Sequence, residues 1–151
     1  MLRINKKMEY ALMCLKHMLE KATSEELTTA REICDKLGAP FDTTSKVLQA
    51  MNHAHILKSV KGIKGGYFLA NDLSQISFIE LARCVENKEF EGPCLSEKGT
   101  CDHFNLCNIK TPVAAINHKV FNFLNQVSIR ELLMGDISKV NNSYKGKEVS
   151  L

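Results

Sequence analysis

Apolar residues in the N-terminal third of the chain recur at intervals of three and four positions, the spacing of one face of an α-helix. The pattern predicts three amphipathic helices, over residues 5–22, 28–37 and 42–53. Asn5 and Asp42 stand at the starts of the first and third, where short polar side chains cap free N–H groups. Only four residues join the second and third helices, which is typical of a helix-turn-helix.

Two strand-like segments follow, residues 56–60 and 67–70, separated by the glycine-rich segment 61–66. They predict an antiparallel hairpin, in which glycines permit close backbone approach and two lysines can contact phosphates. A nucleotide phosphate loop is excluded, because no Gly-Lys-Ser/Thr occurs and a strand follows in place of a helix. A helix-turn-helix followed by such a wing indicates binding to double-stranded DNA.

Hydrogen-bonding side chains gather on the polar face of the third predicted helix and along the hairpin. Such side chains can contact phosphates and base edges, which is what a DNA-binding surface requires. The candidate DNA-binding residues are Thr28, Thr43, Ser45, Lys46, Gln49, Asn52, Ser59, Lys61 and Lys64.

The second half of the chain predicts a helix from Ser77 to about residue 87, a long irregular segment, and a long helix that Pro112 starts. A capping box, Ser128-Ile129-Arg130-Glu131, then begins a short helix that ends near Met134. The long helix carries an apolar seam that calls for a partner helix. Its members are Val113, Ile116, Val120, Leu124 and Val127.

The expected fold class is therefore mainly α, a winged helix-turn-helix with a two-stranded wing and a long C-terminal dimerisation helix. Residues 1–87 would form the DNA-binding domain and residues 88–111 a loop. Residues 112–134 would form the dimerisation helix with a short packing helix, and residues 135–151 a flexible tail.

Composition fits a cytoplasmic protein of 151 residues with no bilayer-spanning apolar run and no signal-peptide pattern at its start. The net charge of +3 is unevenly distributed. Residues 1–70 carry +4, residues 71–108 carry −4 and residues 109–151 carry +3. This asymmetry is either ordinary surface charge or a sign that the N-terminal half contacts a polyanion.

The six cysteines divide into two groups. Cys14, Cys34 and Cys84 are scattered along predicted helices and are expected to pack in the core. The other three, Cys94, Cys101 and Cys107, lie in the irregular segment, where three soft thiolates suit zinc, copper(I) or an iron–sulfur cluster. The alternative is three unrelated thiols in a loop. For a fourth ligand, His103 and Asp102 are the nearest candidates, and both are expected at the surface.

The order of elements, the wing Ser59-Val60-Lys61-Gly62-Ile63-Lys64-Gly65-Gly66-Tyr67 and the three cysteines before a long helix resemble the IscR/NsrR family of bacterial winged-helix repressors. The resemblance implies a homodimer with crossing long helices that binds a palindromic operator. It also implies one iron–sulfur cluster per subunit, with Cys94, Cys101 and Cys107 as ligands.

The resemblance departs from the family at several positions. Lys110 stands where the IscR branch has a histidine ligand, whereas Glu9 matches an acidic residue that reaches the partner's cluster in the nitric-oxide-sensing branch. Lys61 replaces the usual wing arginine, His55 replaces a frequent glycine, and the start of the recognition helix, residues 42–45, differs from that of relatives. Operator preference therefore does not transfer.

The leading hypothesis is a DNA-binding transcriptional regulator, a repressor, whose operator affinity is controlled by a cluster that senses nitric oxide, oxygen or iron–sulfur status. The cluster is expected to be 4Fe–4S in preference to 2Fe–2S, held by Cys94, Cys101, Cys107 and Glu9 of the partner subunit. The alternatives are a thiol-switch or zinc-containing regulator of the same family, or an iron–sulfur redox protein that does not bind DNA. No catalytic constellation stands out, so an enzyme is not expected.

Overall fold

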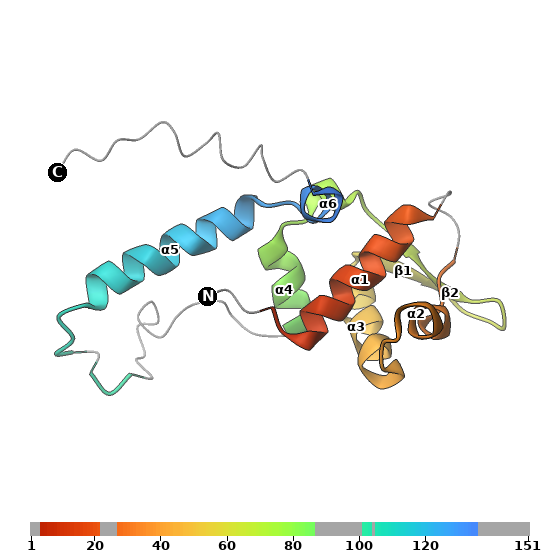
Figure 1. The fold of residues 1–151 in the computed structure, drawn as a ribbon, viewed down its shortest axis with the longest axis horizontal. Helices are drawn as coiled ribbons and strands as arrows, with labels where there is room; N and C mark the ends of the chain where they lie inside the picture. Colours follow the sequence, from red (N-terminus) through yellow and green to blue (C-terminus); the bar gives the residue numbers. More distant parts are fainter. Residues whose placement is uncertain (1–3, 22–26, 87–100, 104, 136–151) are drawn as a thin grey trace.

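The computed structural model describes residues 4–21, 27–86, 101–103 and 105–135, and its architecture is mainly helical with one small antiparallel sheet (Figure 1). This confirms the predicted fold class. In chain order the elements are α1 (Lys6–Glu20), α2 (Ala30–Leu37), α3 (Phe41–His53), β1 (Leu57–Val60), β2 (Gly66–Leu69), the 3₁₀ helix η1 (Leu73–Gln75), α4 (Phe78–Glu86), α5 (Lys110–Gln126) and α6 (Ile129–Met134).

The helix boundaries confirm some of the predicted caps and correct others. The side chain of Asn5 accepts a hydrogen bond from the Met8 N–H at 2.9 Å, as a capping residue should. Helix α3, however, begins at Phe41 with Pro40 as its N-cap, so the prediction that Asp42 caps it is wrong. Asp42 lies in the first turn instead, where its negative charge interacts favourably with the positive end of the helix dipole.

Helix α5 begins two residues before Pro112, at Lys110. Proline is tolerated at the third helical position because the N–H groups of the first turn have no partner within the helix. The predicted irregular segment therefore ends earlier than expected. Most of that segment, including Cys94, and the chain beyond Gly135 lie outside the described residues.

Helices α1, α3 and α4 enclose the core with the inner faces of α2 and β1. The predicted buried side of α3 is confirmed, since Val47, Leu48 and Met51 are all at most 1% exposed. Cys14 is fully buried beside Leu15 on α1, in agreement with its predicted packing role.

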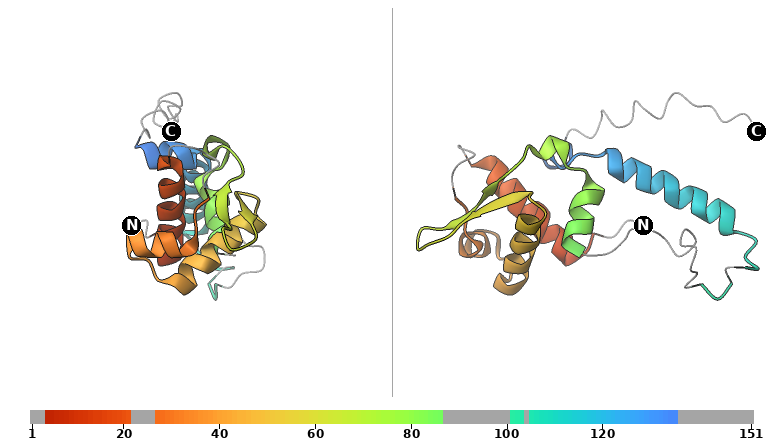
Figure 2. Two further views of the ribbon diagram at one scale, coloured as in Figure 1. Left: turned by 90° about the vertical axis from the view of Figure 1, so that its right-hand side faces the viewer. Right: turned by 180° about the vertical axis from the view of Figure 1, so that it is seen from behind.

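Strands β1 and β2 form the predicted hairpin, paired from Leu57 with Leu69 at its base to Val60 with Gly66 near its tip. Seen from behind, the hairpin projects past α2 and α3 at the end of the molecule opposite α5 (Figure 2). The hairpin follows α3 directly in the chain, and β1 packs against α3.

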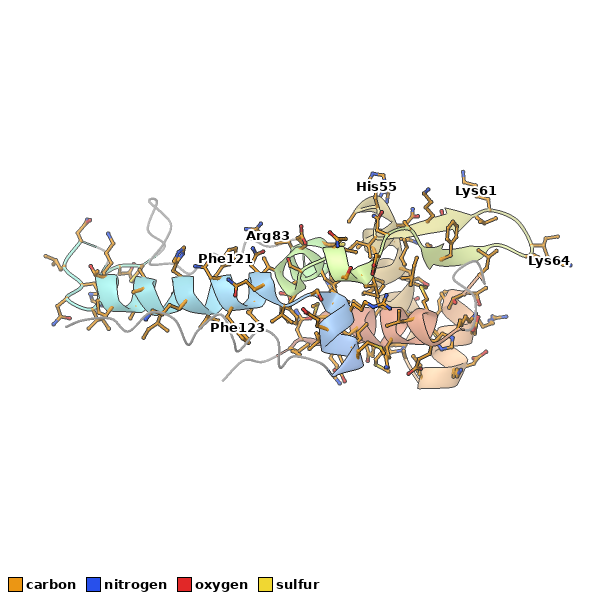
Figure 3. All side chains as sticks on the ribbon, turned by 90° about the horizontal axis from the view of Figure 1, so that it is seen from above. His55, Lys61, Lys64, Arg83, Phe121 and Phe123 are labelled. Atoms are coloured by element: carbon orange, nitrogen blue, oxygen red, sulfur yellow. The ribbon has the colours of Figure 1, made fainter. Side chains whose placement is uncertain are left out.

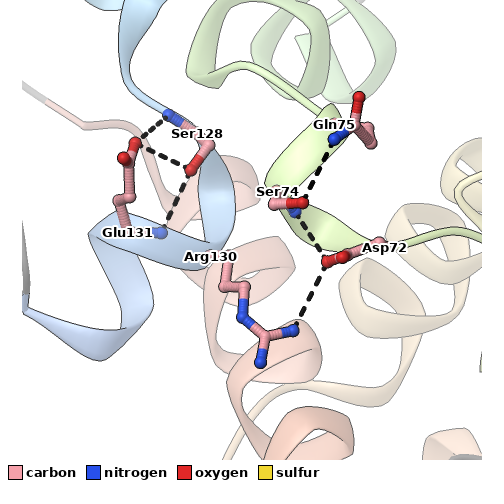
Figure 4. A network of polar contacts seen from close by, with 6 residues as sticks. All are labelled: Asp72, Ser74, Gln75, Ser128, Arg130 and Glu131. Atoms are coloured by element: carbon pink, nitrogen blue, oxygen red, sulfur yellow. Dashed lines mark hydrogen bonds and ion pairs between the residues drawn. The ribbon is translucent and has the colours of Figure 1, made fainter.

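The starts of α4 and α6 are joined by two backbone hydrogen bonds of 2.8 Å, from the Phe78 N–H to the Val127 carbonyl and from the Ile129 N–H to the Ile76 carbonyl. Ser128 and Glu131 form the predicted capping box at the start of α6, and Arg130 pairs with Asp72 of the neighbouring segment (Figure 4). This junction fixes the point from which α5 extends away from the body (Figure 1).

No helix within the described ranges is long and apolar enough to cross a membrane.

Candidate functional site

The outer face of α3 is the most direct candidate for contact with DNA. The structure leaves its five predicted residues partly or fully exposed while Thr44, between two of them, is fully buried. These residues are Thr43, Ser45, Lys46, Gln49 and Asn52. Together they supply one ammonium group, two hydroxyls and two carboxamides, the groups that contact phosphates and base edges.

Helix α2 is held against α1 by a buried polar cluster. His17, which is 5% exposed, bonds through Nε2 to the Glu32 carboxylate at 2.8 Å, and the Lys21 ammonium lies 2.9 Å from the same carboxylate. Partial burial opposes ionisation of Glu32, but the hydrogen bonds from His17 and Lys21 outweigh it and hold its pKa below the usual value. The cluster therefore fixes the first helix of the helix-turn-helix.

The hairpin presents lysines along its exposed edge. Lys61 and Lys64 flank its tip, as predicted, and Figure 3 shows both pointing away from the body. Lys58 on β1 is also exposed, which adds a third ammonium group that the sequence analysis did not select. Strand alternation was a signal that could have identified it, because its neighbour Leu57 is buried.

Thr28 must be removed from the candidate DNA-binding residues. Its side chain is fully buried, and its backbone forms an isolated bridge with Tyr67 of β2 through hydrogen bonds of 2.8 and 2.9 Å. The apolar spacing predicts that Thr28 begins the second helix. That helix starts at Ala30 after Thr29 as N-cap, and Thr28 instead pairs with β2 towards the tip of the hairpin.

His55 connects α3 to β1 in a left-handed backbone conformation, with φ of 58°. This explains why a glycine suits the position, since a residue without Cβ adopts such a conformation without steric cost. The His55 carbonyl accepts a hydrogen bond from the Asn71 side chain at 2.8 Å, which stabilises the turn. The exposed imidazole of His55 lies beside β1, at the edge of an open groove of about 600 Å³ (Figure 3).

Beyond the first turn of α3, the charge along this surface has one sign. Residues 43–71 contain four lysines, two histidines and no aspartate or glutamate. They span α3 except its first two residues, the turn after it and the whole hairpin. Apart from the exposed Asp42 in the first turn of α3, this surface carries no carboxylate on α3 or the hairpin, so it attracts phosphates over most of its length.

Two of the three candidate metal ligands lie within the described residues. Cys101 and Cys107 are free and partly buried, on either side of a turn in which the Leu106 N–H donates to the His103 carbonyl at 3.0 Å. Asp102 and His103 are exposed, as expected. Cys94 is not described, and the part of the chain that the structure describes holds no group of three metal-binding side chains.

Glu9, the candidate fourth ligand, lies in the first turn of α1 with its side chain 46% exposed. Its carboxylate pairs with the Lys6 ammonium at 2.8 Å. Solvent screens the attraction within this exposed pair, so the pair opposes a ligand role only weakly.

The apolar seam of α5 is uncovered over most of its length. Ile116 and Val120 are 63% and 48% exposed, and Ile109 just before the helix is 57% exposed. Only the end of the seam, at Leu124 and Val127, packs into the core.

The family model of Rrf2, described as an iron-dependent transcriptional regulator, matches residues 4–135. A putative HTH-type transcriptional regulator, rrf2-like, of Rhodobacter capsulatus is 26% identical over 137 residues, covering 86% of this chain and 91% of that protein. IscR of Vibrio cholerae is 23% identical over 133 residues, covering 88% of this chain and 76% of its own.

The fold is shared with solved structures of CymR and IscR. CymR of B. subtilis, described as its global cysteine regulator, superposes with a TM-score of 0.67 at 19% identity, covering 89% of this chain and 98% of its own. IscR of T. potens superposes with a TM-score of 0.60 at 17% identity, and the match covers 99% of this chain and 94% of its own. An oxidised form of Staphylococcus aureus CymR has the same fold at a TM-score of 0.63.

Proposed function

Because the chain belongs to the Rrf2 family of transcriptional regulators, we propose that it is a homodimeric repressor whose affinity for a palindromic operator is controlled by an iron–sulfur cluster. The observation that carries the DNA-binding part is the surface formed by α3 and the β1–β2 hairpin. It combines exposed hydrogen-bonding groups with lysines, and residues 43–71 contain no carboxylate side chain.

The proposed mode of DNA recognition follows from the geometry of that surface. Helix α3 is suited to the major groove, where the carboxamides of Gln49 and Asn52 can bond to base edges. The lysines of the hairpin reach the phosphates beside it. Lys61 carries a compact ammonium group in place of the planar guanidinium group of an arginine. It therefore contributes more to electrostatic attraction of phosphates than to recognition of bases.

The homodimer is supported by the uncovered seam of α5. Exposed Ile116 and Val120 need an apolar partner, and a second copy of the same helix supplies one by two-fold symmetry. Such a dimer places two α3 helices to contact half-sites about one helical turn of DNA apart.

The proposed cluster ligands are Cys94, Cys101, Cys107 and Glu9 of the partner subunit. The donor set fits, because Cys101 and Cys107 are free thiols on a short turn and thiolates are the ligands that iron–sulfur clusters take. When bound, the cluster, 4Fe–4S in preference to 2Fe–2S, supplies a centre that reacts with nitric oxide or oxygen. Cys107 lies three residues before α5, so its bond to the cluster would connect the cluster to the start of the helix that carries the proposed dimer contact.

A thiol switch is the second candidate, because the free, partly exposed Cys101 and Cys107 could act without metal, and because the fold is shared with CymR. Zinc bound to the same thiolates is a variant of this candidate. A redox protein that does not bind DNA leaves the winged helix without a role.

The DNA-binding proposal is tested by selecting duplexes from a random library with the full-length protein, then measuring affinity against salt. Lys61→Ala should lower the slope of log affinity against log salt by about one. Gln49→Ala should cost about 1–3 kcal/mol and relax base preference at one position. Lys7→Ala, which removes an exposed lysine from α1, is the matched control and should change neither. Failure to select any sequence contradicts the proposal.

A further inference from the structure

The tip of the hairpin carries an unusual side chain for a surface that attracts DNA. Ile63 is fully exposed, with a relative accessibility of 107%, and it lies between Lys61 and Lys64. Exposing a large aliphatic side chain completely gives up the burial that stabilises such residues elsewhere. The residue is therefore a candidate for a contact that the free protein does not make.

Ile63 is held in place by a tight turn. The Gly65 N–H donates to the Gly62 carbonyl at 2.9 Å, so Ile63 and Lys64 are the two central residues of a hydrogen-bonded four-residue turn. Gly62 has φ of 121°, which L side chains rarely adopt, and a Cβ on Gly65 would collide with the Val60 carbonyl oxygen. The glycines permit this tight turn, and its hydrogen bond closes it with Ile63 at the corner.

The strand that leaves the tip is fixed as well. Thr28 bonds to Tyr67 on the outer side of β2, and a Cβ on Gly66 would approach the Thr28 carbonyl oxygen to 3.0 Å. The hairpin is therefore braced on a third segment of the chain. A side chain presented by a braced hairpin loses little conformational freedom when it binds.

We infer that Ile63 enters the DNA minor groove and makes the hairpin select A·T over G·C base pairs there. This rests on the proposed function. With α3 in the major groove, a narrow tip flanked by two ammonium groups suits the adjacent minor groove, whose walls carry phosphates on both sides. Guanine adds an exocyclic amino group to the groove floor, and the Ile63 methyl groups would remove water from that donor without replacing its hydrogen bond.

The test uses a duplex selected by the wild-type protein and scans its A·T pairs one at a time. Each pair is replaced by inosine·cytosine, which leaves the minor groove without the amino group, and by G·C, which adds it. At the positions under the hairpin, the wild type should bind the A·T and inosine·cytosine duplexes equally and the G·C duplex about tenfold more weakly.

Ile63→Ala should bind the A·T duplex about tenfold more weakly, with an unchanged salt slope because no charge is lost. The ratio of the variant's affinities for the A·T and G·C duplexes should fall towards one. Lys64→Ala should lower the salt slope by about one and keep the ratio. Met134→Ala, which removes another exposed apolar side chain, 61% exposed on α6, should change neither quantity.

The inference is overturned if Ile63→Ala keeps the full discrimination, or if the wild type never distinguishes inosine·cytosine from G·C. The second result would be expected if Ile63 contacted another protein. Failure of the wild type to select any duplex would instead contradict the proposed function, so the two failures are distinguishable.

Discussion

Replacing Ile116 with alanine should weaken the proposed dimer without disturbing the fold of the protomer. Ile116 lies near the middle of α5, 63% exposed, on the apolar seam that also carries Val120. Alanine is a good helix former, so the helix itself should persist. The variant therefore removes apolar surface from the proposed interface and little else.

The magnitude follows from the exposed area. Fully burying an isoleucine contributes about 1.5–3 kcal/mol, so covering the 63% of Ile116 that is exposed contributes about 1–2 kcal/mol in each copy. Alanine retains one of four side-chain carbons, which leaves a loss of about 0.7–1.4 kcal/mol per copy. A two-fold symmetric dimer contains the residue twice, so its Kd should rise about 10- to 100-fold.

Sedimentation equilibrium of the full-length chain measures this Kd, and far-ultraviolet circular dichroism checks that helix content is unchanged. The control is Asn122→Ala, an exposed residue about 240° around α5 from Ile116, which should leave the Kd within threefold or so. An unchanged Kd in Ile116→Ala, or an equal loss in both variants, would refute the assignment of this seam to the dimer.

Three further predictions concern the protomer. Ser128→Ala removes the cap of α6 and should lower the free energy of unfolding by about 1 kcal/mol in denaturant titrations, and a loss near zero would contradict the capping role. Hydrogen bonding by His17 and Lys21 lowers the pKa of Glu32, so Glu32→Gln should lower the free energy of unfolding at pH 7. The difference between the variant and the wild type should disappear as the pH falls through and below the usual range for glutamate. A difference that does not depend on pH would contradict this. Burial raises the pKa of Cys14 to about 12, so iodoacetamide at pH 8 should label Cys14 only after unfolding, as mass spectrometry of the native protein can test.

Helical periodicity and capping residues were sufficient to predict most of the fold, because each helix has an apolar stripe and several helices begin at a side-chain cap. The Asn5 cap and the Ser128 capping box are short-range features, and both are confirmed. The start of α3 was misplaced because Pro40 serves as N-cap without a side-chain bond, a choice that local chemistry does not reveal.

The site was predictable where it depends on local sequence and not where it depends on distant contacts. The exposed face of α3 follows from the periodicity that buries Val47 and Leu48. The burial of Thr28 depends on pairing with Tyr67, 39 positions away, and no local pattern indicates it. The left-handed conformation of His55 likewise became visible only in the folded backbone.

The IscR/NsrR resemblance is confirmed at the level of the family by the match over residues 4–135. The ligand set remains a prediction, since Cys94 lies outside the described residues and Glu9 would act across two subunits. A triad of thiolates assembled from an irregular segment has no periodic signal, so spacing in the sequence indicates the site without fixing its geometry.

The central claim is that the state of a cluster on Cys94, Cys101 and Cys107 controls operator affinity. The most direct test measures the affinity of one anaerobically reconstituted sample, of known iron and sulfide content, for a selected duplex before and after nitric oxide. The account predicts that the affinity changes, and that a variant with all three cysteines replaced by serine neither holds iron and sulfide nor responds. Equal affinity before and after nitric oxide, with or without bound iron, would contradict it.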